Sequence, residues 1–231
     1  MAISLNGIVI ILGNYGSGKT EVAVNLALHM KHKGMEVAIA DLDVINLYFR
    51  TREARSLLDH HHIPIVLPEQ AYLHADFPAL NPRIAALIKT PAPLTILDCG
   101  GNEKGASILG TFANFFRNEI PKLFVVVNPF RPDTDQPAAC IALKNQIEIA
   151  SRQRVTGWIG NANLLEETTP EQIMTGHRFM QDLEKSSNLP VEFITVPDRL
   201  CHTIEKKQLN IPILPLTRHL PLPWEKGDGS P

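Results

Sequence analysis

The stretch that decides the fold is Gly13-Asn14-Tyr15-Gly16-Ser17-Gly18-Lys19-Thr20, which matches the pattern GxxxxGK[ST] at every fixed position. It follows the β-branched apolar run at residues 8–12, which predicts a strand buried on both faces. After it, apolar side chains recur at helical spacing up to Lys33, and Gly34 stands where helix ends favour glycine. The motif therefore lies between a predicted strand and a predicted helix, which is the context that it requires.

This loop has the chemistry of a phosphate-binding loop, or P-loop. Its glycines allow backbone N–H groups to converge on phosphate oxygens at a helix N-terminus, where the helix dipole favours anions. We expect Lys19 to reach the β and γ phosphates and Thr20 to ligate Mg²⁺. An ordinary glycine turn is the alternative, and the filled pattern disfavours it. The residues expected to contact a nucleotide here are Gly13, Asn14, Tyr15, Gly16, Ser17, Gly18, Lys19, Thr20 and Glu21.

Short apolar runs and longer amphipathic stretches alternate along the rest of the chain. Further strands are predicted at residues 37–40, 63–67, 94–97, 123–127, 157–159 and 191–196, and helices at 106–116, 136–150 and 171–186. Parallel neighbours need long crossover connections, so this alternation predicts a three-layer α/β/α fold with a mostly parallel, doubly wound sheet. We expect one domain over residues 1–216. Prolines from Pro212 onward predict a wrapped or frayed stretch, with a proline-rich tail over residues 217–231.

Composition narrows the classes of protein. Lys and Arg number 22 against 24 Asp and Glu, a formal net charge of -2, which disfavours nucleic acid as a partner. Three cysteines without metal-ligand spacing predict neither a disulfide framework nor a zinc site. Apolar runs fall far short of the ~20 residues that cross a bilayer, and no signal peptide is recognised. We therefore expect a cytoplasmic protein without a transmembrane segment. The histidines at 60–62 are predicted to form a polar connection, because consecutive loop residues point in different directions.

Two acidic segments follow predicted strands. Asp98, in Asp98-Cys99-Gly100-Gly101, ends one strand, where a carboxylate can hold a metal and the glycines can move. Asp41 and Asp43 end another strand, and their spacing sends both side chains the same way. We expect Asp98 to lie in the metal's coordination sphere. For Asp41 and Asp43, a solvated loop or a helix cap is the alternative.

The order of the motifs, P-loop, then Asp-x-Asp, then Asp-x-Gly-Gly, resembles the CobQ/CobB/MinD/ParA branch of P-loop NTPases, the SIMIBI class. The resemblance implies a P-loop NTPase fold, ATP/ADP with Mg²⁺ as ligands, and a homodimer or a partner protein at the nucleotide. It implies that Asp43 orients the attacking water. The catalytic residues are then Lys19, Asp43 and Asp98, and those at the metal are Thr20, Asp43 and Asp98.

Two later segments resemble the adenine pocket of this family. Asn161 follows the strand at residues 157–159, and Val196, Pro197 and Asp198 resemble the Val-Pro-x-Asp loop that edges the base. The Asn161 amide offers both a donor and an acceptor to adenine. A guanine site is expected to carry [NT]KxD, which follows neither strand, so ATP is favoured over GTP.

One position departs from the family. MinD and ParA carry a signature lysine directly after the first P-loop glycine, where this chain has Asn14. Arg50 and Arg52, just beyond the Asp-x-Asp segment, are hypothetical substitutes, and ordinary surface charge is the alternative for both.

The leading interpretation is a Mg-ATP-binding P-loop NTPase of the MinD/ParA-like class that hydrolyses ATP to ADP and phosphate as a switch. One alternative is an ATP-dependent ligase or kinase like CobB and dethiobiotin synthetase, acting on a small molecule. A second is a nucleotide-dependent binding module without turnover. Membrane targeting as in MinD is rejected, because prolines break the C-terminal stretch where a basic amphipathic helix would be needed.

Overall fold

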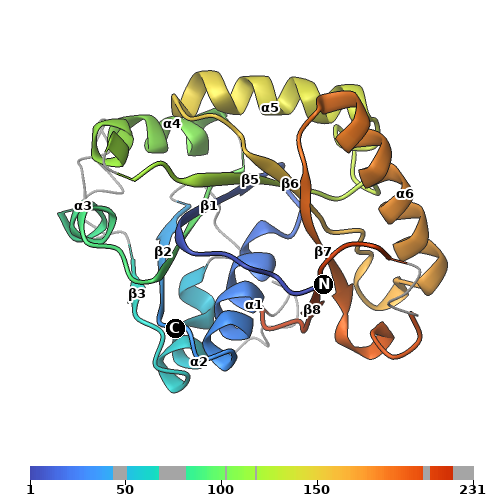
Figure 1. Cartoon of the computed structure of the whole chain (residues 1–231), viewed down its shortest axis with the longest axis horizontal. Helices are drawn as coiled ribbons and strands as arrows, with labels where there is room; N and C mark the ends of the chain where they lie inside the picture. The colour runs from blue at the N-terminus through green and yellow to red at the C-terminus, as the bar shows by residue number, and fades with distance from the viewer. Residues whose placement is uncertain (44–50, 68–81, 102, 118, 205–208, 221–231) are drawn as a thin grey trace, which may run out of the picture.

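Eight parallel strands form one sheet in the order β3-β2-β4-β1-β5-β6-β7-β8 (Figure 1). The computed structural model describes the chain except for residues 44–50, 68–81, 102, 118, 205–208 and 221–231. The strands are β1 (Gly7–Gly13), β2 (Val37–Leu42), β3 (Ile65–Val66), β4 (Leu94–Cys99), β5 (Lys122–Val127), β6 (Gly157–Gly160), β7 (Val191–Pro197) and β8 (Ile213–Leu216). The helices are α1 (Lys19–His32), α2 (Arg55–His60), α3 (Pro82–Lys89), α4 (Glu103–Phe112), α5 (Pro137–Ser151) and α6 (Pro170–Ser187).

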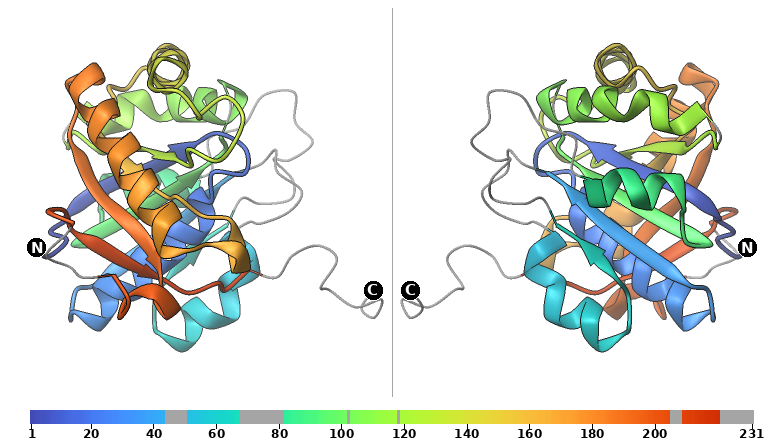
Figure 2. Two further views of the ribbon diagram at one scale, coloured as in Figure 1. Left: turned by 90° about the vertical axis from the view of Figure 1, so that its right-hand side faces the viewer. Right: turned by 90° about the vertical axis from the view of Figure 1, so that its left-hand side faces the viewer.

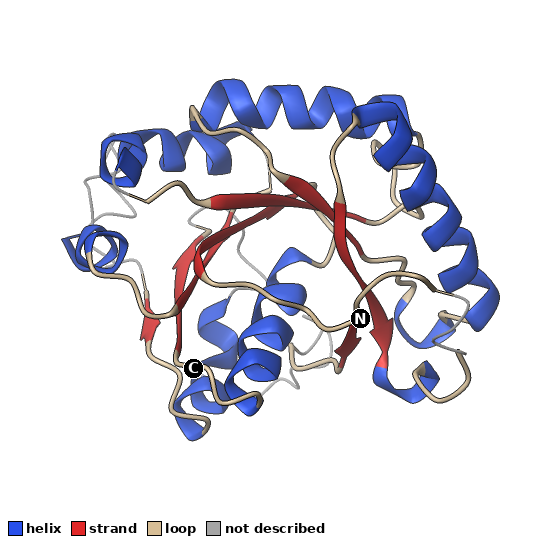
Figure 3. Cartoon of the chain, viewed as in Figure 1, coloured by secondary structure: helices blue, strands red, loops and turns tan. Residues whose placement is uncertain are grey.

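The two largest hydrophobic clusters of the described residues lie on opposite faces of the sheet, and β1 contributes side chains to both. Val9 and Ile11 pack into the core that α1 and α2 cover. Ile8, Ile10 and Leu12 pack into the core beneath α3, α4, α5 and α6. A strand buried on both faces reads as a continuous apolar run, which explains why β1 lacks polar alternation. Figure 3 shows the resulting three layers, and the expected α/β/α fold is confirmed.

The parallel sheet brings the sequence motifs to one edge. β1 lies between β4 and β5, and β4 lies between β1 and β2. Asp98 is paired in register with Ile11 on one side and with Asp41 on the other. Because all strands point the same way, the P-loop and both acidic segments leave the sheet at its carboxyl edge.

The prediction for the stretch that begins at Pro212 is wrong in its first part. Ile213–Leu216 form β8, an edge strand parallel to β7, with Pro215 in register with Val196. Alternate N–H groups of an edge strand point away from the sheet, so a proline there need not remove a ladder bond. Proline content alone therefore understated the strand.

The first residues of the expected tail pack against α1. The Asn25 Nδ2 donates to the Thr217 carbonyl over 2.9 Å, and the Thr217 N–H donates to Asn25 Oδ1 over 2.9 Å. The backbone N–H groups of His219 and Leu220 donate to the Glu21 carboxylate over 2.8 and 3.2 Å. Leu220 is buried in the α1 core. Contacts thus continue four residues past the expected boundary at 216, and residues 221–231 lie outside the described part.

The long predicted helices correspond to α1, α4 with the 3₁₀ turn at residues 113–117, α5 and α6. The short helices α2 and α3 are not singled out by spacing. No helix in the described part of the chain is long and apolar enough to cross a membrane.

Candidate functional site

The P-loop has the backbone conformation that its glycines predict. Gly16 and Gly18 adopt φ angles of +74° and +83°, in the left-handed region that disfavours other residues. The Ser17 N–H donates to the Asn14 carbonyl over 3.1 Å and closes the turn. Gly18 is the N-cap of α1. The first N–H groups of a helix have no intrahelical acceptor, so this end of α1 offers donors to an anion.

The second glycine after Asp98 packs directly on the P-loop backbone. A Cβ on Gly101 would overlap the Gly13 carbonyl oxygen and lie 3.1 Å from the carbonyl carbon of Asn14. A Cβ on Gly100 would lie 3.2 Å from Asp43 Oδ1. The Asp-x-Gly-Gly segment therefore touches both the P-loop and the Asp-x-Asp segment, and its approach to the P-loop backbone requires glycine at position 101.

Lys19 and Asp43 form a buried ion pair. Their Nζ and Oδ2 atoms are 3.3 Å apart, with side-chain exposures of 6% and 1%. Asp41 lies beneath the pair, fully buried, and its Oδ1 accepts the Asp43 N–H over 2.9 Å. The solvated-loop alternative for the two aspartates is therefore wrong. Asp41 holds the turn that brings Asp43 to the P-loop lysine.

Asp98 lies near Thr20 and accepts a hydrogen bond from Thr51, which belongs to none of the sequence motifs. The Thr51 hydroxyl, fully buried, donates to Asp98 Oδ2 over 2.6 Å. Thr20, buried in the first turn of α1, also lies close enough to this carboxylate to lower its pKa. Burial raises the pKa of Asp98 to about 7 and the Asp41 charge adds to this, whereas Lys19 and both threonines oppose it. Thr51 lies outside every recognised motif, so no sequence signal identifies it.

The residues around Asp98 fit a magnesium ion. Asp98 Oδ1 is buried and has no hydrogen-bond partner in the described part of the chain. Asp41, Asp43 and Asp98 outnumber Lys19 as buried charges, so the pocket favours a cation. No group of three or more metal-binding side chains exists among the described residues, histidines 60–62 included. Mg²⁺ does not need such a cage, because it takes one or two protein oxygens with phosphates and waters.

Asn161 connects the P-loop to β7. Its Nδ2 donates to the Ser17 carbonyl over 2.7 Å, and its Oδ1 accepts from the Thr195 hydroxyl over 2.5 Å. The same Nδ2 lies against Gly18, where a Cβ would overlap it. Asn161 therefore helps to hold the backbone of the P-loop in place. Thr195, which sequence reasoning missed, fixes the orientation of the Asn161 amide.

The segment expected to edge the base closes the same region. Val196 and Pro197 end β7 and are buried, whereas Asp198 begins a 3₁₀ turn and is exposed. The following Arg199 donates to the carbonyls of Leu165, Glu166 and Thr168 over 3.3, 2.8 and 3.0 Å. The loops after β6 and β7 are therefore tied together beside Asn161.

The remaining predicted residues divide into three groups. The Asn14 Oδ1 accepts the Tyr15 N–H over 2.8 Å, and Tyr15 is exposed. The Glu21 carboxylate faces the C-terminal segment, so only its backbone is available to a nucleotide, and burial raises its pKa to about 7. Arg50, and the side chain of Arg52, lie outside the described residues.

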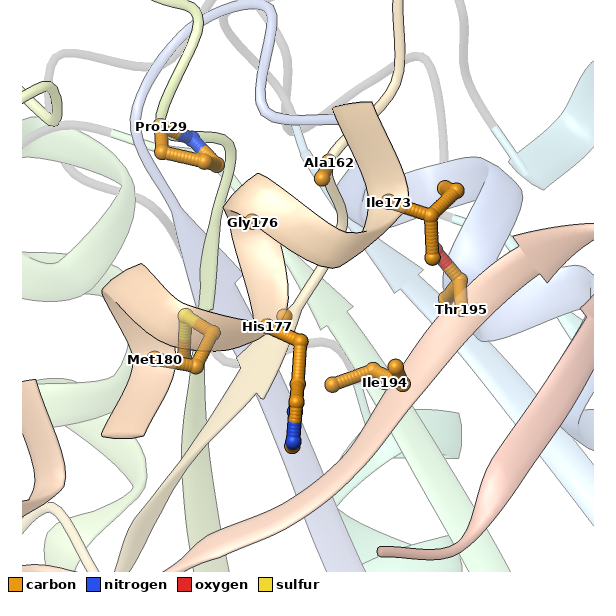
Figure 4. Close-up of a pocket in the computed structure, with 9 residues that line it drawn as sticks. Pro129, Ala162, Ile173, Gly176, His177, Met180, Ile194 and Thr195 are labelled. Carbon is orange, nitrogen blue, oxygen red and sulfur yellow. The ribbon is translucent and has the colours of Figure 1, made fainter. Parts of the chain in front are cut away.

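A small hollow lies behind the Asn161–Thr195 contact, between α6 and the sheet (Figure 4). His177 of α6 lines it, is 7% exposed, and has an Nδ1 without a hydrogen-bond partner among the described residues. Burial lowers the pKa of His177 below 6.5, and Glu184 opposes this. The hollow is lined by Pro129, Gly160, Ala162, Ile173, Gly176, His177, Met180, Ile194 and Thr195.

Replacement of His177 is expected to reduce the acid sensitivity of the fold. Because its pKa is lower when folded, the native state binds fewer protons than the unfolded state as pH falls through 6.5, so stability falls. Urea unfolding between about pH 8 and about pH 5.5 should shift in favour of His177→Leu by up to about 1.4 kcal/mol. The exposed His202 supplies the control, His202→Leu. An identical pH dependence in His177→Leu and the wild type would contradict the assignment.

A P-loop at the end of the central strand, facing an aspartate on the neighbouring parallel strand, defines a P-loop nucleoside-triphosphate-binding protein. The family model of the CobQ/CobB/MinD/ParA nucleotide binding domain matches residues 8–168, more than half of the chain. The protein belongs to this family, within the SIMIBI class of P-loop NTPases. No curated protein matches the chain.

Solved structures share the fold at low sequence identity. FtsY from Mycoplasma mycoides is 17% identical with a TM-score of 0.57, over 82% of this chain and 60% of that chain. Cell division protein FtsY from Thermotoga maritima is 16% identical with a TM-score of 0.59, over 84% and 62%. The signal recognition particle 54 kDa protein from Aeropyrum pernix, in complex with GDP, is 17% identical with a TM-score of 0.54, over 83% and 41%. The match thus spans less than two thirds of each of these chains.

Proposed function

We propose that the protein binds Mg-ATP at its P-loop and hydrolyses ATP to ADP and phosphate as a switch of the MinD/ParA-like class. The position of Thr20 beside Asp98, both buried, carries the proposal together with the Asp98 Oδ1, which has no hydrogen-bond partner in the described part of the chain. A threonine of the P-loop helix and a carboxylate at a strand end are the two protein groups that hold Mg²⁺ in P-loop NTPases. Family membership supports the same reading.

Each site residue then has a separate task. Thr20 and Asp98 hold Mg²⁺, and Asp43 is the further carboxylate beside them. When bound, Mg²⁺ would neutralise charge on the phosphate oxygens. Lys19 binds the phosphate chain, the N-terminus of α1 donates its N–H groups, and Asp43 orients the water that attacks the γ-phosphate.

The buried ion pair suggests how phosphate binding prepares Asp43. In the free protein, Lys19 and Asp43 neutralise each other across 3.3 Å. Phosphate oxygens compete for the same ammonium group, so nucleotide binding weakens the pair. The Asp43 carboxylate then becomes a better acceptor for the proton of a water molecule. We propose that this exchange of partners links binding to turnover.

We propose ATP over GTP for the base. In [NT]KxD, aspartate accepts hydrogen bonds from guanine, whereas Leu164 stands at that place after Asn161. The Asn161 amide retains one N–H and acceptor capacity beyond its bonds to Ser17 and Thr195, and Val196 and Pro197 with Asp198 edge the base. The Aeropyrum pernix structure contains GDP, so the choice of base must be measured on this protein.

Proposals on the partner, the extent of the domain and the location accompany the proposed nucleotide-dependent switch. A homodimer or a partner protein distinguishes the ATP-bound state from the ADP-bound state. One nucleotide-binding domain covers residues 1–216, together with the segment that packs against α1. We also propose a cytoplasmic location, which three free cysteines support because disulfides are rare in that compartment.

The test measures nucleotide binding and phosphate release on the same preparation. We expect ATP to bind more tightly than GTP and phosphate release to require Mg²⁺. Asp43→Asn should lower turnover by about 100-fold or more. It should retain or strengthen ATP binding, because Lys19 loses its competing partner.

Asp182→Asn, at an exposed residue of α6 that has no part in the proposed site, is the matched control and should keep turnover. Tight ATP binding with background turnover in the wild type would favour a binding module. Phosphoryl transfer to an added small molecule in place of water would favour a kinase or ligase. Tighter binding of GTP would overturn the ATP assignment.

A further inference from the structure

A second basic side chain lies against the P-loop in the folded chain. The loop after β5 passes beside the P-loop, because β5 is the neighbour of β1 in the sheet. Figure 2 shows this yellow-green loop next to the dark-blue P-loop. An ideal Cβ on Gly16 would lie 3.7 Å from Nε and 3.9 Å from Cδ of Arg131. The Arg131 side chain therefore lies beside Gly16 of the P-loop turn.

The loop that carries Arg131 is held in one conformation by hydrogen bonds. The Arg131 N–H donates to the Asn128 carbonyl over 3.1 Å, and the fully buried Thr134 hydroxyl donates to the same carbonyl over 2.8 Å. The Asn128 side chain accepts the Phe130 N–H over 3.1 Å and donates to the Asn163 carbonyl over 2.8 Å. These bonds anchor the loop to the segment after β6. The backbone from which the Arg131 side chain extends is therefore held in place before a ligand binds.

Within the described part of the chain, Arg131 makes no ion pair that would explain its position. No carboxylate of the described residues lies within ion-pairing distance of its guanidinium, and the residue is exposed. The exposed arginine at 199, by contrast, bonds to three carbonyls. A positive charge held next to an anion-binding loop, without an acid to neutralise it, is suited to a phosphate ligand.

The charges of the other side chains at the P-loop also favour a further cation at this place. Lys19 is paired with Asp43, and Asp41 and Asp98 add further buried carboxylates. The Asn14 side chain brings no charge and folds back onto the Tyr15 N–H. A triphosphate bound to this loop therefore meets few positive groups of the P-loop itself.

We propose that Arg131 binds the phosphate chain of the nucleotide held by the P-loop of its own subunit. The guanidinium moves from its place beside Gly16 onto phosphate oxygens, where it forms two parallel N–H···O bonds. The residue acts within one chain, so its own contribution to nucleotide affinity does not depend on assembly. The inference rests on the proposed function, because it requires nucleotide at the P-loop.

The test is titration of the full chain with a fluorescent ATP analogue. Arg131→Ala should weaken binding by about tenfold or more, and Arg131→Lys by less, because lysine keeps the charge but loses the two-pronged geometry. Arg154→Ala is the matched control, since Arg154 is exposed and precedes β6 at the opposite edge of the sheet. It should leave the affinity within about twofold of the wild type.

Two further measurements separate the possible failures. The loss of affinity in Arg131→Ala relative to the wild type should be the same at about 0.5 µM and about 50 µM protein, because a contact within one chain does not follow mass action of subunits. Arg131→Gln, with an unfolding midpoint equal to that of the wild type, should reproduce the loss seen in Arg131→Ala and so excludes misfolding as its cause.

Wild-type affinity in Arg131→Ala or Arg131→Gln would overturn the role of Arg131 and leave the proposed function standing. A loss that arises only at the higher protein concentration would overturn action within one chain. If the wild-type protein binds neither ATP nor GTP, both the proposed function and this inference are wrong.

Discussion

Lys19→Ala is expected to weaken ATP binding by about 100-fold or more, because charge-assisted bonds from one ammonium to two phosphates are lost together. The structure adds a second consequence. Lys19 is the buried partner of Asp43, so its removal leaves that carboxylate buried without its cation. Breaking a buried pair from one side costs about 3 kcal/mol or more. Lys19→Ala should therefore lower both the affinity for ATP, measured by titration calorimetry, and the free energy of unfolding, measured in urea.

A double variant separates these two losses. Lys19→Ala with Asp43→Asn removes the buried charge, so it should regain much of the stability while ATP still fails to bind. Lys33→Ala, just past the end of α1 and exposed, is the control and should change neither quantity. ATP binding of wild-type strength in the double variant would show that Lys19 does not hold phosphate.

Gly101→Ala is the second change with a large expected effect. The new methyl group would overlap the Gly13 carbonyl oxygen, a backbone atom that no rotamer change can move aside. Either β4 or the P-loop must shift, at a cost of about 3 kcal/mol for overpacking. Since the P-loop is built around backbone N–H groups, we expect ATP binding to fall by about 100-fold or more along with stability.

Gly34→Ala provides the matched comparison for that glycine. A Cβ on Gly34 would meet no atom within 4 Å, and its φ is +83°. Only the left-handed backbone then carries a penalty, about 1 kcal/mol, and nucleotide binding should be unchanged. If Gly101→Ala behaves like Gly34→Ala in both measurements, the contact between the Asp-x-Gly-Gly segment and the P-loop is not essential.

Sequence reasoning did not find the contacts between residues that lie far apart in the chain. Thr51 binds Asp98 from 47 positions away, and Asn161 reaches Ser17 across 144 positions. Glu21 directly follows the P-loop in the sequence. Its carboxylate nevertheless accepts hydrogen bonds from the backbone of His219 and Leu220, near the other end of the described chain. Local spacing contains no information on such pairs, because strand order and register decide which segments meet.

The amino-acid sequence by itself determined the local structures and the chemical groups of this protein. The apolar run before Gly13, the glycines of the loop and the helical spacing after it specify a strand, a turn and a helix, since each depends on neighbouring residues only. The tertiary structure decided which groups meet: Lys19 with Asp43, and Arg131 with the turn at Gly16. Those contacts arise because β2, β4, β1 and β5 lie side by side and open at one edge, which no single segment specifies.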